Sequence, residues 1–108
     1  MDIKELTIAQ IEEIQRMFSS SPSMFPHLGK NVYIRTVTYH YTGRAVRLEG
    51  NFLVLEHAAW VASSRRWTHA LKTGELDEVE PYPNGTTVNI DTIVDVSPWD
   101  HVLPKDVK

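Results

Sequence analysis

The segment GRAVRLEGNFLVLEHAAWV, residues 43–61, is the most informative part of this chain about its fold. It predicts two β-strands joined by a tight turn at residues 49–51, because a Glu-Gly-Asn triplet interrupts two runs rich in aliphatic side chains. Residues 52–55 form a continuous apolar run, which is typical of a strand that is buried on both faces. Gly43 indicates a bulge or sharp bend where this hairpin joins the preceding strand.

Further β-strands are expected on both sides of the hairpin. Residues 31–43, NVYIRTVTYHYTG, are rich in Val, Ile, Thr and Tyr and alternate between two faces, as a strand does. Residues 86–99, TTVNIDTIVDVSPW, predict two short strands with a polar break near residues 89–92. The chain therefore has the pattern of a mainly β protein.

Two helices are also predicted. Residues 8–19 carry apolar side chains at helical spacing, and a capping-box pattern stands at their start. A shorter helix is expected over residues 65–73, with Ser64 as its N-cap and Gly74 as its C-cap. The serines and prolines of residues 20–30 predict an irregular linker between the first helix and the strands.

Length and composition limit the classes of function. The 108 residues fit one domain with a small hydrophobic core. No apolar run is long enough to span a membrane, and the first twenty residues lack the apolar block of a signal peptide. The chain contains no cysteine, which excludes disulfides and thiolate chemistry and fits a reducing compartment.

Charge is distributed unevenly along the chain, whose formal net charge is −3. Residues 29–72 hold seven basic against two acidic side chains, whereas residues 73–108 hold two basic against eight acidic ones. Such a basic segment suits nucleic acid or a neighbouring copy of the same chain. Charges that complement each other within one folded chain are an equally good interpretation.

The sequence contains no pattern typical of a catalytic or metal site. Its five histidines do not stand at ligand-like spacing with one another or with a carboxylate, and no thiolate is present to assist them. There is no nucleophile-elbow pattern and no glycine-rich phosphate loop. We therefore expect a protein that is not an enzyme, with no catalytic residues, no metal and no cofactor.

Aromatic and basic side chains together suggest a second type of site. Stacking on aromatic rings beside arginines is a common way to hold single-stranded nucleic acid. The competing interpretation, packing in the core or at a subunit interface, is the favoured one. The residues concerned are Tyr33, Tyr39, Tyr41, Trp60, Trp67 and Trp99 with Arg35, Arg44 and Arg47.

Two blocks of sequence resemble the Sm-like family, the small β-barrels of Sm, LSm and Hfq proteins. GKNVYIR at residues 29–35 and TGRAVRLEGNFLVLEHA at residues 42–58 are similar to the first Sm motif. TVNIDTIVDVSP at residues 87–98 is similar to the second motif. The segment RRWTHALKTGELDEVEP, residues 65–81, is similar to insertions in a divergent branch that tailed bacteriophages encode.

This resemblance implies a fold class and a division of the chain. The fold would be mainly β: an N-terminal helix on a strongly bent, five-stranded antiparallel barrel, with a helical insertion between strands three and four. A single Sm-like domain would cover residues 1–108. Its parts would be the helix at 8–19, the linker at 20–30, the barrel at 31–98 with the insertion at 63–83, and a tail at 99–108.

The resemblance also implies partners. In the family, the fourth strand of one copy pairs with the fifth of the next and closes a ring by heterologous contacts. A homo-oligomeric ring, from pentamer to heptamer, is thus expected, with RNA or single-stranded nucleic acid as ligand and no membrane. We expect a cytoplasmic protein, in the host cytoplasm if it is viral. The nucleic-acid-binding residues would be Arg35, Arg44, Arg47, Asn51 and Asn89, and the pore loops would hold Glu49 and Asp91.

The second motif departs from the family's pattern at the pore. The family places an Arg-Gly or Lys-His pair where this chain has Asn89 and Asp91, so the basic groups that grip RNA are missing. This departure favours an alternative function, a viral structural or adaptor ring that binds protein and not nucleic acid. For Asp91, the favoured role is a cap that accepts backbone N–H groups of the turn, and the alternative is a carboxylate facing the pore.

Overall fold

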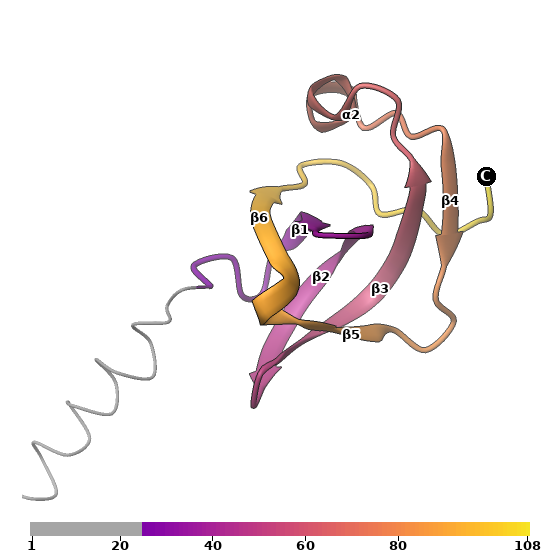
Figure 1. Cartoon of the computed structure of the whole chain (residues 1–108). Helices are drawn as coiled ribbons and strands as arrows, with labels where there is room; N and C mark the ends of the chain where they lie inside the picture. Colours follow the sequence, from indigo (N-terminus) through magenta and orange to yellow (C-terminus); the bar gives the residue numbers. More distant parts are fainter. Residues whose placement is uncertain (1–24) are drawn as a thin grey trace, which may run out of the picture.

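The structure is a computed structural model that describes residues 25–108 (Figure 1). The helix predicted at residues 8–19 and the linker before Phe25 lie outside the described residues. The elements are β1 (Asn31–Thr36), β2 (His40–Glu49), β3 (Phe52–Ser63), α2 (Trp67–Thr73), β4 (Glu78–Pro81), β5 (Thr86–Asn89), the 3-10 turn η1 (Ile90–Thr92) and β6 (Ile93–Pro98).

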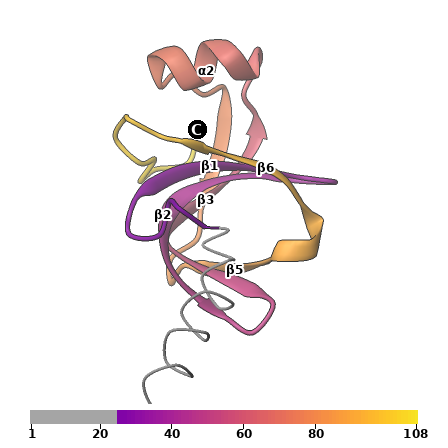
Figure 2. The ribbon, with the colours of Figure 1, turned by 90° about the vertical axis from the view of Figure 1, so that its left-hand side faces the viewer.

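The strands form one strongly bent antiparallel sheet. Its order is β4-β3-β2-β1-β6. Strand β5 also pairs with β3, at residues 52–55, whereas β4 pairs with β3 at residues 59–63. Figures 1 and 2 show the sheet curling into an open barrel, with α2 at one end. The mainly β class, the bent antiparallel sheet and the helical insertion after the third strand are thus confirmed.

The described sheet has six strands where five were expected. The additional strand is β4, since the first of the two strands predicted in residues 86–99 is β5. Strands β4 and β5 pair with successive parts of β3 through Ala59↔Pro81 and Leu55↔Thr86. Residues 82–85, which include Asn84 and Gly85, separate β4 from β5. Strand β4 therefore lies within the segment 63–83 that was predicted to be an insertion.

The barrel bends where β2, β3 and the residue before β5 lie close together, and each of these segments has an unusual backbone feature there. On β2, the register shifts at Gly43, where a Cβ atom would lie 3.2 Å from Ala58 Cα. On β3, His57 has a φ of 51°, in the left-handed region that bends the strand. Beside them, Gly85 has a φ of 75°, and a Cβ there would lie 2.5 Å from the Leu55 carbonyl oxygen. The bulge predicted at Gly43 is therefore confirmed.

Two hydrophobic clusters lie on the two faces of β1. Successive strand residues point to opposite faces, so Val32 and Ile34 enter the barrel while Tyr33 faces α2 and the tail. The barrel cluster contains Phe25, Val32, Ile34, Ala45, Leu53, Leu55, Ala58 and Val88. The second cluster contains Tyr33, Val61, Ala70, Leu76, Val79 and Trp99.

The prediction that residues 52–55 are buried on both faces is wrong. Leu53 and Leu55 are buried in the barrel, but Phe52 is 46% exposed and Val54 is half-buried. The second cluster contacts β3 only at its other end, through Val61, so the outer face near Phe52 has no covering layer within the described chain.

The segment 31–43 forms two strands instead of one. After β1, the chain turns between Thr36 and Tyr39, where the Thr36 N–H donates to the Tyr39 carbonyl over 2.8 Å. The Thr36 hydroxyl oxygen also accepts from the Tyr39 N–H over 2.8 Å. The two residues inside the turn are Val37 and Thr38, which favour strands, so the alternation concealed the turn.

The short helix begins later than predicted. Arg66 is its N-cap and makes no capping hydrogen bond with its side chain, while the Ser64 hydroxyl donates to the Arg65 carbonyl. The C-terminus is as expected: Gly74 has a φ of 80°, and its N–H donates to the Ala70 carbonyl over 2.7 Å.

Candidate nucleic-acid interface

The β2–β3 turn and the η1 turn meet through three side chains. The Asn51 side-chain amide donates to Asn89 Oδ1 and to Asp91 Oδ2, each over 2.8 Å. The Ile90 N–H donates to the Asn51 carbonyl over 3.0 Å. They meet because β5 pairs with the first residues of β3, which places Asn89 opposite Phe52. We call Asn51, Asn89 and Asp91 the loop cluster.

The cap of the η1 turn is Asn89 and not Asp91, so the favoured prediction for Asp91 is wrong. Asn89 has extended backbone angles at the N-cap position, and its Oδ1 accepts the Asp91 N–H over 3.0 Å. A side chain at the N-cap reaches the amide two residues ahead, whereas a residue inside the turn does not. The Asp91 carboxylate is exposed and accepts from Asn51.

The predicted arginines lie in three different settings. Arg47 Nε is 3.0 Å from Glu49 Oε1, and both side chains are exposed, close to the β2–β3 turn. Arg44 is exposed further along β2, and it has no ion-pair partner within the described chain. Arg35 lies elsewhere, on β1, where its guanidinium bonds to Asp95 of β6.

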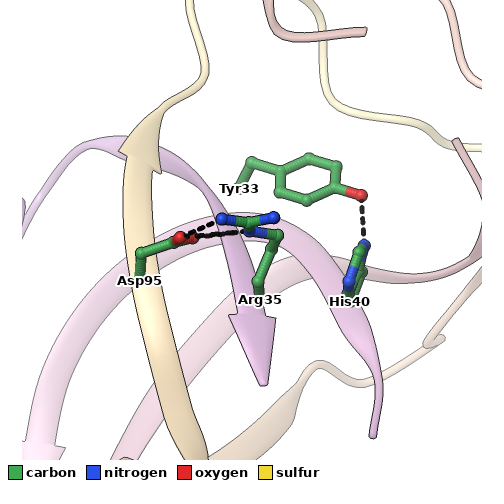
Figure 3. A network of polar contacts seen from close by, with 4 residues as sticks. All are labelled: Tyr33, Arg35, His40 and Asp95. Atoms are coloured by element: carbon green, nitrogen blue, oxygen red, sulfur yellow. Dashed lines mark hydrogen bonds and ion pairs between the residues drawn. The ribbon is translucent and has the colours of Figure 1, made fainter. Parts of the chain in front are cut away.

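Arg35 belongs to a polar network with Tyr33, His40 and Asp95 (Figure 3), and it also contacts the inserted helix. Its Nε lies 3.0 Å from Asp95 Oδ1, and its guanidinium carbon lies 3.7 Å from the centre of a Trp67 ring on α2. Beside it, the buried Tyr33 Oη lies 2.7 Å from His40 Nδ1. Arg35 therefore lies apart from the loop cluster, and its charge and its ring contact join β1, β6 and α2.

The network shifts the ionisation of its members. Hydrogen bonds from Arg35 lower the pKa of Asp95. Burial raises the pKa of Tyr33. Burial also lowers the pKa of His40, and the neighbouring charge of Arg35 lowers it further, against a smaller opposing effect of Asp95.

Acidification from about pH 7.5 to about pH 5.5 should lower the free energy of unfolding through His40. The folded-state pKa of His40 lies below its ordinary value, so its contribution is complete above about pH 6.5. That contribution is lost as the pH falls toward the folded-state pKa. Urea unfolding across this range should show the decrease, and His40→Gln should reduce it. Equal curves for His40→Gln and the parent chain would contradict the prediction.

The aromatic residues divide between core and surface. Tyr33 and Trp99 are buried, as the favoured interpretation required, whereas Tyr39 is 52% exposed. Tyr39 contacts Trp60, and Tyr41 contacts Tyr82. Tyr82 was missed in the sequence because it lies between two prolines in an acidic segment, and only the pairing of β4 with β3 brings it to this cluster.

Residues 25–108 show neither a metal centre nor a membrane-spanning helix. There, no group of three or more His, Cys, Asp or Glu side chains is placed to hold a metal ion. The described helices include none that is long and apolar enough to cross a membrane.

Comparison with known proteins gives matches among solved structures. No protein-family model matches the sequence. No curated protein matches it either. A heptameric archaeal Sm protein is 17% identical with a TM-score of 0.48, covering 70% of this chain and 94% of its own. The P. aerophilum SmAP1 heptamer is 16% identical with a TM-score of 0.49, over 72% and 89%. The Pyrococcus abyssii Sm protein in complex with a uridine heptamer is 18% identical with a TM-score of 0.48, over 69% and 90%. The likeness to these Sm proteins is one of fold alone.

Proposed function

We propose that this chain assembles into a homo-oligomeric ring through its sheet edges and binds single-stranded RNA at the loop cluster. The observation that carries the proposal is the hydrogen-bonded union of Asn51, Asn89 and Asp91, which places the turns of both Sm-like motifs at one exposed point. The absence of cysteine fits a cytoplasmic protein.

The chemistry of the loop cluster suits bases better than phosphates. The Asn51 side-chain N–H groups donate inside the cluster, so its side-chain oxygen Oδ1 stays available as an acceptor. The Asn89 side-chain N–H groups stay available as donors, because only its Oδ1 is used in the cluster. Amide edges of this kind read the edges of unstacked bases. The Asp91 carboxylate would repel a phosphate by about 1–4 kcal/mol at close range, so the phosphates would lie toward Arg44 and Arg47.

The free sheet edges support self-association. Strand β6 pairs only with β1, and β5 pairs only with β3, within the described chain. Strand β4 is different, since the Val79 N–H and carbonyl both bond to the backbone of Lys108. Unpaired edges invite pairing with another copy. The heterologous contact would thus join β6 of one copy to β5 of the next.

Light scattering should give the mass of a multimer, and Val94→Glu should dissociate it. Val94 is an apolar side chain on the edge strand β6 and is 62% exposed, so a charge there would be buried without a partner in the assembled ring. The matched control is Val102→Glu, because Val102 is 83% exposed on the tail. A single-subunit mass for the parent chain at micromolar concentration would contradict the ring.

Asn51→Ala should weaken RNA binding roughly ten-fold, because it removes one hydrogen-bond donor to each of Asn89 and Asp91 and an acceptor for the base. The measurement is fluorescence anisotropy with labelled oligouridine and oligoadenine at low salt. Asn84→Ala is the control, since Asn84 is exposed and makes no side-chain hydrogen bond within the described residues.

Arg44→Ala should reduce the salt dependence of RNA binding by about one phosphate contact. Failure of both oligonucleotides to bind the parent chain would refute this function.

A further inference from the structure

Three aromatic side chains line an open, shallow cleft at the end of the β2–β3 hairpin away from the loop cluster. Tyr39, Trp60 and Tyr82 line this cavity of about 240 Å³, which we call the aromatic cleft. The hairpin register places His40 opposite Val61 near the cleft. The turn at residues 49–51, which contributes to the loop cluster, closes the other end of the same hairpin. The two sites are therefore separate features of the molecule.

The rings of the aromatic cleft form adjoining walls and not a parallel stack. The Tyr39 and Trp60 ring centres are 5.8 Å apart, and their planes are inclined by 86°. Tyr41 packs beside them, with its ring centre 6.4 Å from that of Tyr39 and 6.3 Å from that of Tyr82. Aromatic ring faces carry partial negative charge and attract cations, most strongly in the case of tryptophan.

The charge beside the cleft is negative. Glu80 is exposed on β4 and is the direct cross-strand partner of Trp60, and direct partners in an antiparallel pair point to the same face of the sheet. Arg65 lines an adjoining groove together with Tyr39 and Trp60, and its Nε lies 3.3 Å from Asp77 Oδ1. A cation would thus meet aromatic faces and a carboxylate, whereas a phosphate would meet the same carboxylate unfavourably.

We propose that the aromatic cleft binds a positively charged side chain of a partner protein: an arginine, a lysine or a methylated lysine. The cation lies against the ring faces of Tyr39, Trp60 and Tyr82, and Glu80 supplies the opposite charge. This inference goes beyond RNA binding at the loop cluster and does not depend on it. Single-stranded RNA is the less suitable occupant, because the rings offer no parallel stack and Glu80 repels its phosphates.

The direct test follows the indole N–H signal of Trp60 by NMR in the full chain. The probes are the N-acetyl methylamide of trimethyllysine and its neutral isostere, in which carbon replaces the ammonium nitrogen. The charged probe should shift the Trp60 signal and leave that of the buried Trp99 in place. A Trp60→Phe variant assigns the signal. The neutral isostere should bind at least roughly five-fold more weakly, since it lacks the attraction between cation and ring.

Variants separate the cleft from the rest of the fold. Tyr39→Ala should abolish the shift, and Tyr39→Phe, which keeps the ring, should preserve it; the exposure of Tyr39 makes both tolerable. Glu80→Gln should weaken binding roughly three-fold to five-fold. The matched control Glu49→Gln removes a carboxylate at the other end of the hairpin and should leave the affinity for the charged probe unchanged. Asn51→Ala should likewise leave the binding of the charged probe intact, so failure at one site is distinguishable from failure at the other.

Three results would overturn the proposal. Equal shifts from the charged probe and its isostere would mean that the cleft is only an apolar pocket. No shift at millimolar concentrations of the charged probe would mean that it does not bind cations. A Trp60 shift caused by oligouridine, lost in Arg65→Ala and retained in Glu80→Gln, would make the cleft a nucleic-acid surface instead.

Discussion

Gly85→Ala should lower the free energy of unfolding by roughly 2–4 kcal/mol. Gly85 has a φ of 75°, and an L-residue with a side chain is destabilised there by about 1–2 kcal/mol, because its Cβ clashes with its own carbonyl oxygen. A Cβ there would also lie 2.5 Å from the Leu55 carbonyl oxygen, a backbone atom that cannot rotate away. Because Leu55 pairs with Thr86 at the start of β5, moving either strand would also disturb the bend of β3.

Gly50→Ala is the matched control for this prediction. Gly50 also has a positive φ, 57°, but a Cβ there meets nothing within 4 Å. Its substitution should therefore cost only the conformational part, about 1 kcal/mol. Urea unfolding of the two variants and the parent chain measures both values. Similar losses for the two alanines would show that the close approach at Leu55 does not constrain the strand.

Much of the fold was predictable because local signals agreed with it. The Glu-Gly-Asn turn, the bulge at Gly43 and the polar break at residues 89–92 stand where the structure has them. Each combines a residue suited to the backbone conformation with flanking apolar residues that fix the face of the sheet. The end of the inserted helix at Gly74 was predictable for the same reason.

What could not be predicted depends on contacts between distant segments. Strand β4 carries two glutamates and a proline within four residues, and it is a strand only because β3 pairs with it. Arg35 appeared suited to phosphate binding because it stands between tyrosines in a strand. Its partners Asp95 and Trp67 lie far along the chain, so no local pattern revealed that this arginine holds the inserted helix.

The loop cluster was predictable from the sequence in one respect and not in another. The resemblance to the Sm-like family singled out Asn51, Asn89 and Asp91, and the structure joins these three side chains by hydrogen bonds. It did not indicate which side chain caps the η1 turn, because Asn and Asp are both good caps and the choice depends on where the turn begins. Starting the turn at Ile90 makes Asn89 the cap and leaves the Asp91 carboxylate exposed.

Trp99→Ala should lower the free energy of unfolding by about 3–5 kcal/mol, the usual cost of removing a large aromatic side chain from a core. Trp99 is 2% exposed, and its ring centre lies 5.8 Å from that of Tyr33 and 4.9 Å from that of His101. Its indole N–H donates to the Val102 carbonyl over 3.2 Å. The residue that begins the predicted tail is therefore a central part of the second hydrophobic cluster.

The effect of Trp99→Ala should concentrate on the layer outside the barrel. Hydrogen exchange should accelerate first in α2 and at Val79, whose backbone bonds to Lys108, while the pairing of β2 with β3 stays protected. The control Val107→Ala changes a side chain that is 74% exposed and should be nearly neutral. Because the loop cluster lies on the barrel and not on this layer, oligouridine binding should persist in whatever fraction of Trp99→Ala remains folded. Uniform loss of protection across the whole sheet would instead mean that the barrel cannot form without the layer that Trp99 anchors.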